Sequence, residues 1–290
     1  MARLVFLTLE DRTGFVIDDA IAIDALVRRG HVVTEVPWRR FDTAAPCDGV
    51  IVRTPWDYQH DLEAFLALLD RIEAAGIPLE NAAALCRWNS DKRYLEELRT
   101  RGVATVPTLF GQHLDAATLA ELPTRLGTAA WVLKPTVGAN ADHTHRFDGP
   151  PDDATVRDLV RTFAARGFMA QPFVRAVVEE GEISLFYFGG RFSHAVQKRP
   201  KSGDFRVQEE HGGHIAPLDP DAHLKRAAAK VLAALPYVPL QARVDLVHLD
   251  DGTPALMELE AIEPSLYFRM HPRAADHYAD AVESWLGRGA

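Results

Sequence analysis

A pair of strand-like segments near the C-terminus constrains the fold more than any other feature of the sequence. Residues 241–249 and 253–261 largely alternate between apolar and polar side chains, and Asp251-Gly252 between them is a favoured two-residue hairpin turn. We therefore predict an antiparallel hairpin closed by this turn. Because successive side chains of a strand point to opposite faces, one face is apolar and carries Val244, Leu246, Met257 and Leu259.

The opposite face of the predicted hairpin gathers charged groups. In the register set by the turn, Asp245 faces Glu258 and Arg243 faces Glu260. Opposed carboxylates repel each other across a sheet unless a cation lies between them. Hard oxygen ligands at this spacing suit Mg²⁺, which shares its remaining positions with waters and substrate phosphates. The pattern therefore predicts a magnesium site; the alternative is a solvated sheet face with one arginine–glutamate pair.

The N-terminal part of the chain alternates between strand and helix patterns. Short apolar runs are typical of buried parallel strands, and segments with apolar residues at helical spacing lie between them. Gly30 and Gly76 follow two of these segments, where a helix would end. The predicted elements are strands at 3–8, 31–36 and 49–52 and helices at 17–29 and 62–75. This rhythm predicts a small parallel sheet with helices on its faces, an α/β arrangement.

The pattern changes near residues 88 and 170. We therefore predict three domains, at 1–87, 88–170 and 171–290. Asn89 or Ser90 is a credible N-cap for a helix through Leu98, and Gly189-Gly190 between two strand-like runs predicts a second hairpin. The remaining predicted elements are strands at 131–134, 183–188 and 192–197 and helices at 155–166, 222–234 and 274–285.

The amino-acid composition and net charge exclude several classes of protein. The 290 residues are 47% hydrophobic and 25% charged, values typical of a globular protein. A chain with a formal net charge of −9 lacks the basic field that recruits nucleic acid or an anionic membrane. No apolar run is as long as a membrane span, and Cys47 and Cys86 are the only cysteines. We therefore expect a cytoplasmic protein that binds neither nucleic acid nor membrane.

Several familiar site motifs are absent from the sequence, including the P-loop, the dinucleotide-binding glycine fingerprint and the zinc-protease motif. Histidine pairs at 143 and 145 and at 211 and 214 leave a metallohydrolase open, although no spacing completes such a site. The simpler interpretation is that these histidines lie in loops and bond to solvent or phosphate. Three basic residues near loop-forming segments are candidate phosphate clamps: Lys92, Lys134 and Arg206.

The order of these residues along the chain resembles that of the ATP-grasp superfamily, over residues 88–270. The resemblance implies a fold in which an N-terminal βαβ lobe precedes two lobes that sandwich ATP. The residues that it implies are Lys92 and Lys134 for the ATP phosphates, Gln171, Phe173 and Val174 for adenine, Glu182 for ribose, Lys198 and Arg206 near the γ-phosphate, and Asp245, Glu258 and Glu260 for two magnesium ions.

Three segments narrow the resemblance to small-molecule ligases related to the cyclo-ligase of D-cycloserine biosynthesis, with prokaryotic glutathione synthetase as a more distant relative. These segments are residues 53–58, 192–196 and 258–267. The chain departs from the family pattern at two places. The loop after Lys134 has only Gly138 where many members have several glycines, and Glu260 stands where asparagine is more usual. These departures affect the loop that closes over ATP and the acidity of the metal site.

The resemblance implies an amide-forming reaction. A substrate carboxylate would attack the γ-phosphoryl group of ATP to give an acyl phosphate, and an amine of the same or another molecule would displace phosphate. Lys134 and Arg206 would neutralise the transferring group, and Arg243 would stabilise the tetrahedral oxyanion. The candidate general bases are Asp18, Asp19 and Asp57.

The resemblance places the substrate pocket between the N-terminal lobe and the hairpin. The residues that it implies there are Arg53, Trp56, Asp57, Ser265 and Tyr267. Arg53 would bind a carboxylate through two hydrogen bonds, or would form a surface ion pair with Asp57. Trp56 and Tyr58 have packing as their alternative role. The partners expected are a small-molecule carboxylate and an amine, with a homodimer as the assembly considered. Two other functions stay open: a small-molecule kinase on the same fold and a non-catalytic nucleotide-binding protein.

Overall fold

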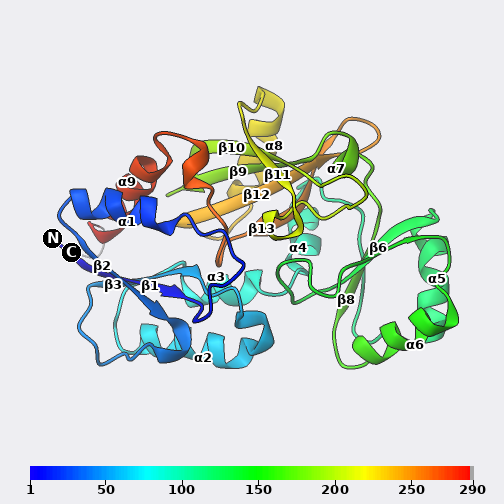
Figure 1. Ribbon diagram of the computed structural model, residues 1–290, viewed down its shortest axis with the longest axis horizontal. Helices are drawn as coiled ribbons and strands as arrows, with labels where there is room; N and C mark the ends of the chain where they lie inside the picture. Colours follow the sequence, from blue (N-terminus) through cyan, green and yellow to red (C-terminus); the bar gives the residue numbers. More distant parts are fainter. Residues whose placement is uncertain (288–290) are drawn as a thin grey trace.

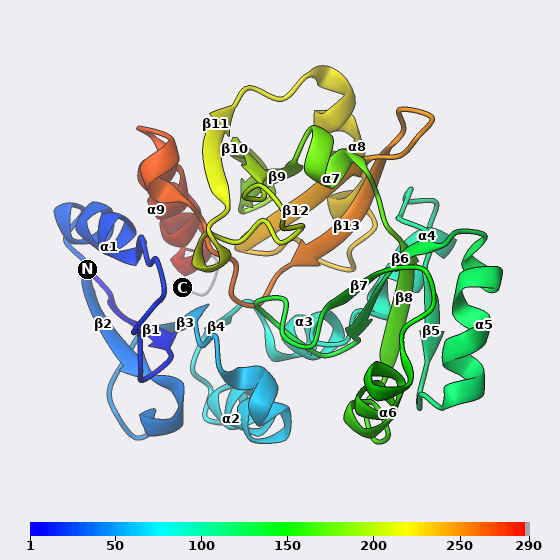
Figure 2. The ribbon, with the colours of Figure 1, turned by 45° about the vertical axis from the view of Figure 1, so that its right-hand side comes forward.

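The structure is a computed structural model that describes residues 1–287, and it contains three β-sheets (Figure 1). One sheet is parallel and two are antiparallel, so the predicted α/β class is confirmed. Each sheet forms the centre of one lobe (Figure 2). Within residues 1–287, no helix is both long and apolar enough to cross a lipid bilayer.

The N-terminal lobe is a four-stranded sheet flanked by helices. Its elements are β1 (Arg3–Thr8), α1 (Asp19–Arg28), β2 (Val32–Pro37), β3 (Gly49–Thr54), α2 (Leu62–Ala74) and β4 (Leu79–Glu80), with 3₁₀ turns at Trp38–Arg40 and Tyr58–His60. The strand order is β2-β1-β3-β4, and every pair is parallel. Gly30 and Gly76 adopt φ values of 88° and 73° soon after α1 and α2, the left-handed conformation that favours glycine. The predicted parallel sheet is confirmed.

The middle lobe is a four-stranded antiparallel sheet with the order β5-β8-β6-β7. The elements of this part of the chain are α3 (Ala83–Asn89), α4 (Tyr94–Thr100), β5 (Leu109–Gly111), α5 (Ala116–Leu126), β6 (Ala130–Pro135), β7 (His145–Asp148), α6 (Asp153–Thr162) and β8 (Phe168–Pro172). The domain boundary expected at residue 170 falls inside β8, so the last strand of this sheet extends past it.

The single helix predicted from Asn89 or Ser90 through Leu98 does not begin at either residue. The chain forms two short helices instead, and Asn89 is the last residue of α3 and does not cap α4. The Asn89 side chain is engaged elsewhere: its Nδ2 donates to Leu259 O at 2.8 Å, and its Oδ1 accepts from Ala261 N at 2.7 Å. This long-range contact joins α3 to the C-terminal hairpin. It leaves Lys92 in the connection between the two helices.

The C-terminal lobe is a five-stranded antiparallel sheet with the order β11-β10-β9-β12-β13. Its elements are α7 (Ala176–Glu179), β9 (Glu182–Phe188), β10 (Arg191–Arg199), β11 (His214–Leu218), α8 (Ala222–Ala233), β12 (Gln241–His248), β13 (Pro254–Glu260) and α9 (Ala274–Leu286), with 3₁₀ turns at Glu209–His211 and Phe268–Met270. The hairpin predicted at Gly189-Gly190 is confirmed as β9–β10.

The C-terminal hairpin differs from the prediction at its turn. Gly252 N donates to Leu249 O at 2.8 Å and Leu249 N donates to Thr253 O at 3.0 Å, so the loop has three residues rather than two. Gly252 takes φ 78°, the left-handed residue typical of three-residue hairpin loops. A bulge at Met257 absorbs the extra residue, because the register shifts between Asp245 and Leu246.

The bulge corrects one face assignment and preserves the rest. Beyond it, Asp245 still pairs with Glu258 and Arg243 with Glu260, as predicted. Leu256, not Met257, joins Val244, Leu246 and Leu259 in the apolar core. Met257 instead lines a pocket between the middle and C-terminal lobes.

The last helix returns to the first lobe. Helix α9 lies beside α1 (Figure 1), and their side chains share one core with the parallel sheet and β9. In this core Phe188 of β9 packs edge-on against Tyr278 of α9, with ring centroids 5.2 Å apart. The first and third lobes are therefore joined by buried apolar surface, which fixes their relative position.

Candidate active site

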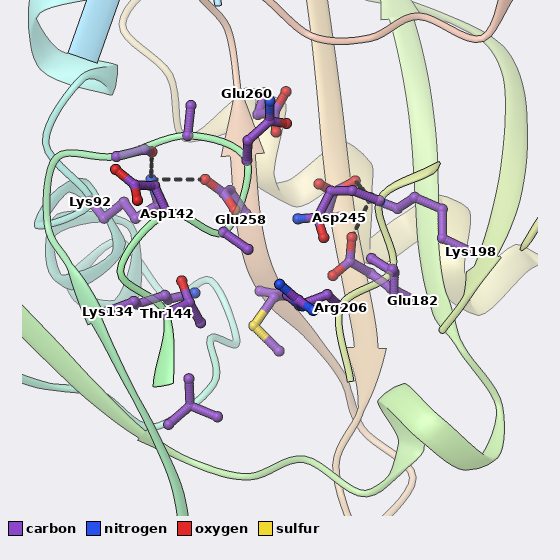
Figure 3. A pocket seen from close by; sticks show the side chains of 18 of the residues that line it. Lys92, Lys134, Asp142, Thr144, Glu182, Lys198, Arg206, Asp245, Glu258 and Glu260 are labelled. Atoms are coloured by element: carbon purple, nitrogen blue, oxygen red, sulfur yellow. Dashed lines mark hydrogen bonds and ion pairs between the residues drawn. The ribbon is translucent and has the colours of Figure 1, made fainter. Parts of the chain in front are cut away.

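One pocket collects most of the residues that the sequence predicted for the site. Its walls come from β6 and β8 of the middle lobe and from β9, β10, β12 and β13 of the C-terminal lobe (Figure 3). The predicted residues that line it are Trp56, Lys92, Lys134, Gln171, Phe173, Val174, Glu182, Lys198, Arg206, Arg243, Asp245, Glu258, Glu260, Ser265 and Tyr267. Two predicted residues, Arg53 and Asp57, do not line it.

Asp245 lies on the floor of this pocket and is 1% exposed. Its carboxylate accepts from Ser184 Oγ at 2.5 Å and from Arg243 Nη2 at 2.9 Å, and Lys198 Nζ lies 3.4 Å away. Burial alone would raise the pKa of Asp245, but Arg243 and Lys198 outweigh it and lower the pKa to about 2. Asp245 is therefore ionised at neutral pH and is held rigidly.

Glu258 forms an ion pair with a lysine from the other side of the pocket. Lys92 Nζ lies 3.1 Å from its Oε1 and also donates to Gly138 O at 2.6 Å (Figure 3). Burial opposes both charges, but the attraction prevails: the pKa of Glu258 is lowered and that of Lys92 is raised. This pair ties the hairpin to the loop that follows β6.

Two further carboxylates line the pocket beside basic groups. Glu260 contacts Arg243, and Glu182 contacts Lys198. Burial, together with the neighbouring Glu258 and Asp245, raises the pKa of Glu260 to about 7 in spite of Arg243. Burial likewise raises the pKa of Glu182. At these two carboxyl groups, burial and the neighbouring carboxylates together outweigh the attraction of the adjacent cations.

The chemistry of the hairpin carboxylates fits magnesium, although each of them is paired with a cation of the protein. Asp245, Glu258 and Glu260 present oxygen ligands from one sheet face into the pocket. Within residues 1–287, no three acidic, histidine or cysteine side chains already converge as a metal site. The protein cations hold these carboxylates apart, so a metal ion would have to replace contacts from Lys92 or Arg243.

Lys134 differs from the other lysines of the pocket. It is the half-buried lysine of β6, and within the described residues its ammonium group forms neither an ion pair nor a hydrogen bond. Partial burial lowers its pKa. A partly buried cation without a partner carries a desolvation cost, which an anionic ligand would offset.

The predicted adenine-binding segment follows the end of β8. Gln171 is 3% exposed, and its Nε2 donates to Thr108 Oγ1 at 2.9 Å. The Phe173 N–H donates to Ala130 O at 2.9 Å, so this N–H is already used by the sheet. The Phe173 ring packs against the Arg146 guanidinium, 3.7 Å from its centroid.

Comparison with known proteins decides the family. Residues 4–81 match the family described as the N-terminal domain of D-cycloserine synthetase DcsG. The chain is 31% identical over 269 residues to the cycloserine biosynthesis protein DcsG of Streptomyces lavendulae, covering 87% of this chain and 85% of that protein. A crystal structure of D-cycloserine synthetase DcsG matches with a TM-score of 0.87 at 28% identity, over 98% of this chain and 99% of that one. The chain belongs to the ATP-grasp ligases.

More distant relatives agree with this family. The glutathione synthetase of Prochlorococcus marinus (strain MIT 9313) is 30% identical over 171 residues, 58% of this chain and 52% of that protein. A structure of D-alanine–D-alanine ligase from Bacillus anthracis, complexed with ATP, has the same fold: its TM-score is 0.69 at 17% identity, over 100% of this chain and 98% of that one. The predicted ATP-grasp fold and family resemblance are confirmed.

Arg53 has a structural place in this ATP-grasp ligase, away from the pocket. It is 1% exposed and donates to Asp19 Oδ1 at 2.7 Å and to Gln241 Oε1 at 2.8 Å. Neither a bound carboxylate nor a surface pair with Asp57 is compatible with this burial. Asp57 lies outside the pocket as well and accepts from Trp38 Nε1 at 2.7 Å. The N-terminal lobe therefore uses both residues for internal contacts.

Trp56, Ser265 and Tyr267 form the end of the ligase pocket that faces the N-terminal lobe. The Trp56 indole donates to Glu263 O at 2.8 Å. Tyr267 adopts φ 45° and is 5% exposed, an unusual conformation for a buried aromatic residue. Glu263 is a pocket residue that the sequence analysis missed, and Ser184, which is fully buried and donates to Asp245, is a missed supporting residue. Glu263 lies inside a segment that carried the resemblance, and its charge in an apolar context was an available signal.

The loop between β6 and β7 shows how the ligase tolerates the missing glycines. Asn140, Ala141 and His143 take φ values of 53°, 56° and 49°, a region that glycine enters at little cost. His211 Nε2 lies 3.2 Å from Asn140 O and contacts the loop from the C-terminal lobe. The histidine pairs thus contribute loop contacts, and they assemble no metal cluster within residues 1–287.

His194 supports the segment that carries Ser265 and Tyr267. Its Nε2 lies 3.0 Å from Leu266 O, a pure acceptor, so the proton is on Nε2. Its Nδ1 accepts from Ser193 Oγ at 3.0 Å, and Ser193 Oγ accepts from His277 Nδ1 at 3.0 Å. The ring also stacks on Phe186 with centroids 4.3 Å apart. A chain of hydrogen bonds therefore runs from α9 to the segment that carries Ser265 and Tyr267.

His194 is expected to contribute a loss of stability in mild acid. Burial lowers the pKa of His194 to about 4, so between that value and about 6.5 the unfolded chain binds the extra proton. The contribution of His194 to the free energy of unfolding should be fully present above about pH 6.5 and should be lost, by about 3 kcal/mol, as the pH falls to 4. The raised pKa values of Glu260 and Glu263 act in the opposite direction over this range, so the effect is measured as the difference between the native enzyme and a variant without the imidazole. Urea unfolding across this range checks it. His194→Gln cannot titrate there, so its stability relative to the native enzyme should rise by about 3 kcal/mol between pH 6.5 and pH 4; identical profiles would contradict the assignment.

Proposed function

We propose that this ATP-grasp ligase joins a carboxylate to an amine of an amino-acid-like small molecule through an acyl phosphate. The observation that carries the proposal is one pocket in which three hairpin carboxylates lie among lysines and arginines of the middle and C-terminal lobes. The similarity to DcsG supports an amino-acid-like substrate, and an intramolecular cyclo-ligase reaction is the specific form that we propose.

Each group of pocket residues has a separate proposed role in binding ATP or magnesium. Asp245, Glu258 and Glu260 would hold magnesium, which supplies positive charge beside the ATP phosphates when bound. Among residues 1–287 Lys134 has no ion-pair or hydrogen-bond partner, which supports a direct contact between its ammonium group and a phosphate. Arg206 and Lys198 add positive charge on the facing side (Figure 3). Gln171, Phe173 and Val174 would contact adenine, and Glu182 the ribose hydroxyls.

The proposed reaction has two steps, formation of the acyl phosphate and its conversion to the amide. A carboxylate oxygen of the substrate attacks the γ-phosphorus, the bond to the β-phosphate oxygen breaks, and ADP leaves. The amine nitrogen then adds to the acyl carbon, loses a proton, and expels inorganic phosphate as the amide forms. Arg243 is positioned by Asp245 and Glu260 to stabilise the oxyanion of the second step.

A screen for ADP release over amino acids and amino-acid analogues tests this function. We expect release that depends on one class of amino acid and on magnesium, with a hydroxamate formed when hydroxylamine is added to trap the acyl phosphate. A stable phosphoester without hydroxamate would indicate a small-molecule kinase instead. ATP binding without turnover on any amino acid would indicate a non-catalytic nucleotide-binding protein.

Replacing Glu182 tests the ribose assignment. Glu182→Ala should raise the KM for ATP by about 10- to 100-fold, because a charge-assisted hydrogen bond contributes about 1.5–3 kcal/mol. The kcat should fall much less, since ribose contacts are alike in the ground and transition states. Glu182→Gln, which retains an acceptor, is the matched control and should lie between. Steady-state kinetics against ATP measure both constants, and a loss confined to kcat would place the ribose elsewhere.

A further inference from the structure

Glu263 is a pocket residue to which the reaction described above gives no part. It follows β13 by three residues, lines the pocket and is 8% exposed. Its backbone is fixed, because Trp56 Nε1 donates to its carbonyl oxygen at 2.8 Å. The carboxyl group is therefore held at the end of the pocket formed by Trp56, Ser265 and Tyr267.

A charge inventory of the pocket sets Glu263 apart. Each of the four carboxylates that β9, β12 and β13 contribute is in contact with a lysine or arginine. These pairs are Glu182 with Lys198, Asp245 with Arg243, Glu258 with Lys92 and Glu260 with Arg243. Within residues 1–287, Glu263 forms no such pair, and its carboxyl group has the Tyr58 hydroxyl as its hydrogen-bond partner.

A buried carboxylate without a cation is costly, so a compensating group is expected from a ligand. Burial, and after it the neighbouring Glu260, raises the pKa of Glu263 to about 8. ATP cannot compensate this charge because it is itself a polyanion. The hairpin carboxylates offer magnesium more oxygen ligands than Glu263 does. The remaining source of positive charge is the substrate.

We propose that Glu263 determines specificity by binding the ammonium group of the amino-acid substrate. The Tyr58 hydroxyl orients its carboxylate, and Trp56 fixes its backbone. An ammonium group between Glu263 and the ATP phosphates would place the substrate carboxylate toward Arg243 and Lys134. This inference rests on the proposed function and names the substrate class of the same site: a small molecule that carries both a carboxylate and an ammonium group.

The test compares substrates that differ only in the ammonium group. The best amino acid from the ADP-release screen is measured beside the carboxylic acid that lacks its amino group. Saturating hydroxylamine serves as the nucleophile, so loss of the amino group does not remove the attacking nitrogen. For the native enzyme we expect kcat/KM for the amino acid to exceed that for the carboxylic acid by about 10- to 100-fold, the range of a charge-assisted hydrogen bond.

Two variants then test whether Glu263 causes the preference for the amino acid over the carboxylic acid. Glu263→Gln keeps the shape and removes the charge; it should raise the KM for the amino acid by about 10- to 100-fold, leave the KM for ATP within about threefold, and abolish the preference over the carboxylic acid. Tyr58→Phe is the matched control, since it removes the orienting hydroxyl but not the charge, and should cost only a few-fold. Because glutamine relieves a buried charge, the melting temperature should be unchanged or higher.

Each other outcome overturns the inference. Equal kcat/KM values for the two substrates with the native enzyme would contradict the inference. This measurement needs no variant, so it tests the inference even if Glu263→Gln does not fold. A preference retained in Glu263→Gln, or a change confined to its magnesium dependence, would contradict the inference as well. A screen in which no amino acid supports ADP release contradicts the proposed function itself, and the two failures are thereby distinguished.

Discussion

Replacing Glu258 by glutamine is expected to lower turnover by about 10²- to 10³-fold, the largest effect that we predict for a single hairpin residue. Glutamine keeps the shape of the side chain but removes the charge of one of the three pocket carboxyl groups that we propose as magnesium ligands. The magnesium concentration at half-maximal rate should rise as well. Turnover measured against magnesium concentration checks both effects.

The stability of Glu258→Gln is expected to differ from what the hairpin alone suggests. Across the strands Glu258 opposes Asp245, and relief of that repulsion would stabilise the variant. The structure adds Lys92, 3.1 Å from the Glu258 carboxylate, and the lowered pKa of Glu258 shows that attraction prevails over repulsion and burial. We therefore expect a small drop in melting temperature without ligands.

Asp250→Asn is the matched control for Glu258→Gln. Asp250 lies exposed in the loop of the same hairpin, so this variant removes one negative charge without touching the pocket. It should have native turnover and native magnesium dependence. Native turnover with an unchanged magnesium curve in Glu258→Gln itself would exclude the metal assignment and remove the main support for the ligase mechanism.

Lys134→Met and Lys92→Met should have opposite effects on stability although both abolish most activity. Lys134 is half-buried and has no partner among residues 1–287, so methionine removes a partly desolvated charge that no other group of these residues compensates; its melting temperature should be unchanged or higher. Lys92→Met leaves Glu258 unpaired and removes the bond to Gly138 O, at an expected cost of about 1–3 kcal/mol. Turnover should fall by about 10²- to 10³-fold in each.

Thermal unfolding of the two lysine variants with and without ATP measures the difference. Saturating ATP should raise the melting temperature of the native enzyme more than that of Lys134→Met, because the variant lacks the cation that we assign to a phosphate. Equal destabilisation by the two substitutions would show that Lys134 has a structural partner. In that case its assignment to a phosphate would lose its physical basis.

The parts of the site that were predictable depend on strand periodicity. Asp245 faces Glu258 and Arg243 faces Glu260 because side chains alternate along a strand and the register is set locally. The turn was predicted one residue too short, yet the bulge at Met257 restored the register before the charged pairs. The pairing predicted for the charged residues is therefore correct although the predicted turn is not.

The burial of Arg53 could not be predicted from the sequence. Its two partners, Asp19 and Gln241, lie 34 and 188 residues away along the chain. A charged residue after a strand has the same local pattern whether it faces a ligand or an internal carboxylate. Only the packing of the C-terminal sheet against the first lobe, with α9 beside α1, decides that Arg53 is enclosed.

The sequence by itself determined the βαβ pattern of the first lobe, the charged face of the hairpin and the family, because periodicity is local and motif order is read along the chain. The tertiary structure alone decided which charges neutralise each other. Lys92 meets Glu258 across lobes, whereas Lys134 and Glu263 are left without an oppositely charged partner among residues 1–287. Coulomb attraction and the cost of burial depend on distances between segments remote in sequence, and these distances exist only once the three sheets enclose one pocket.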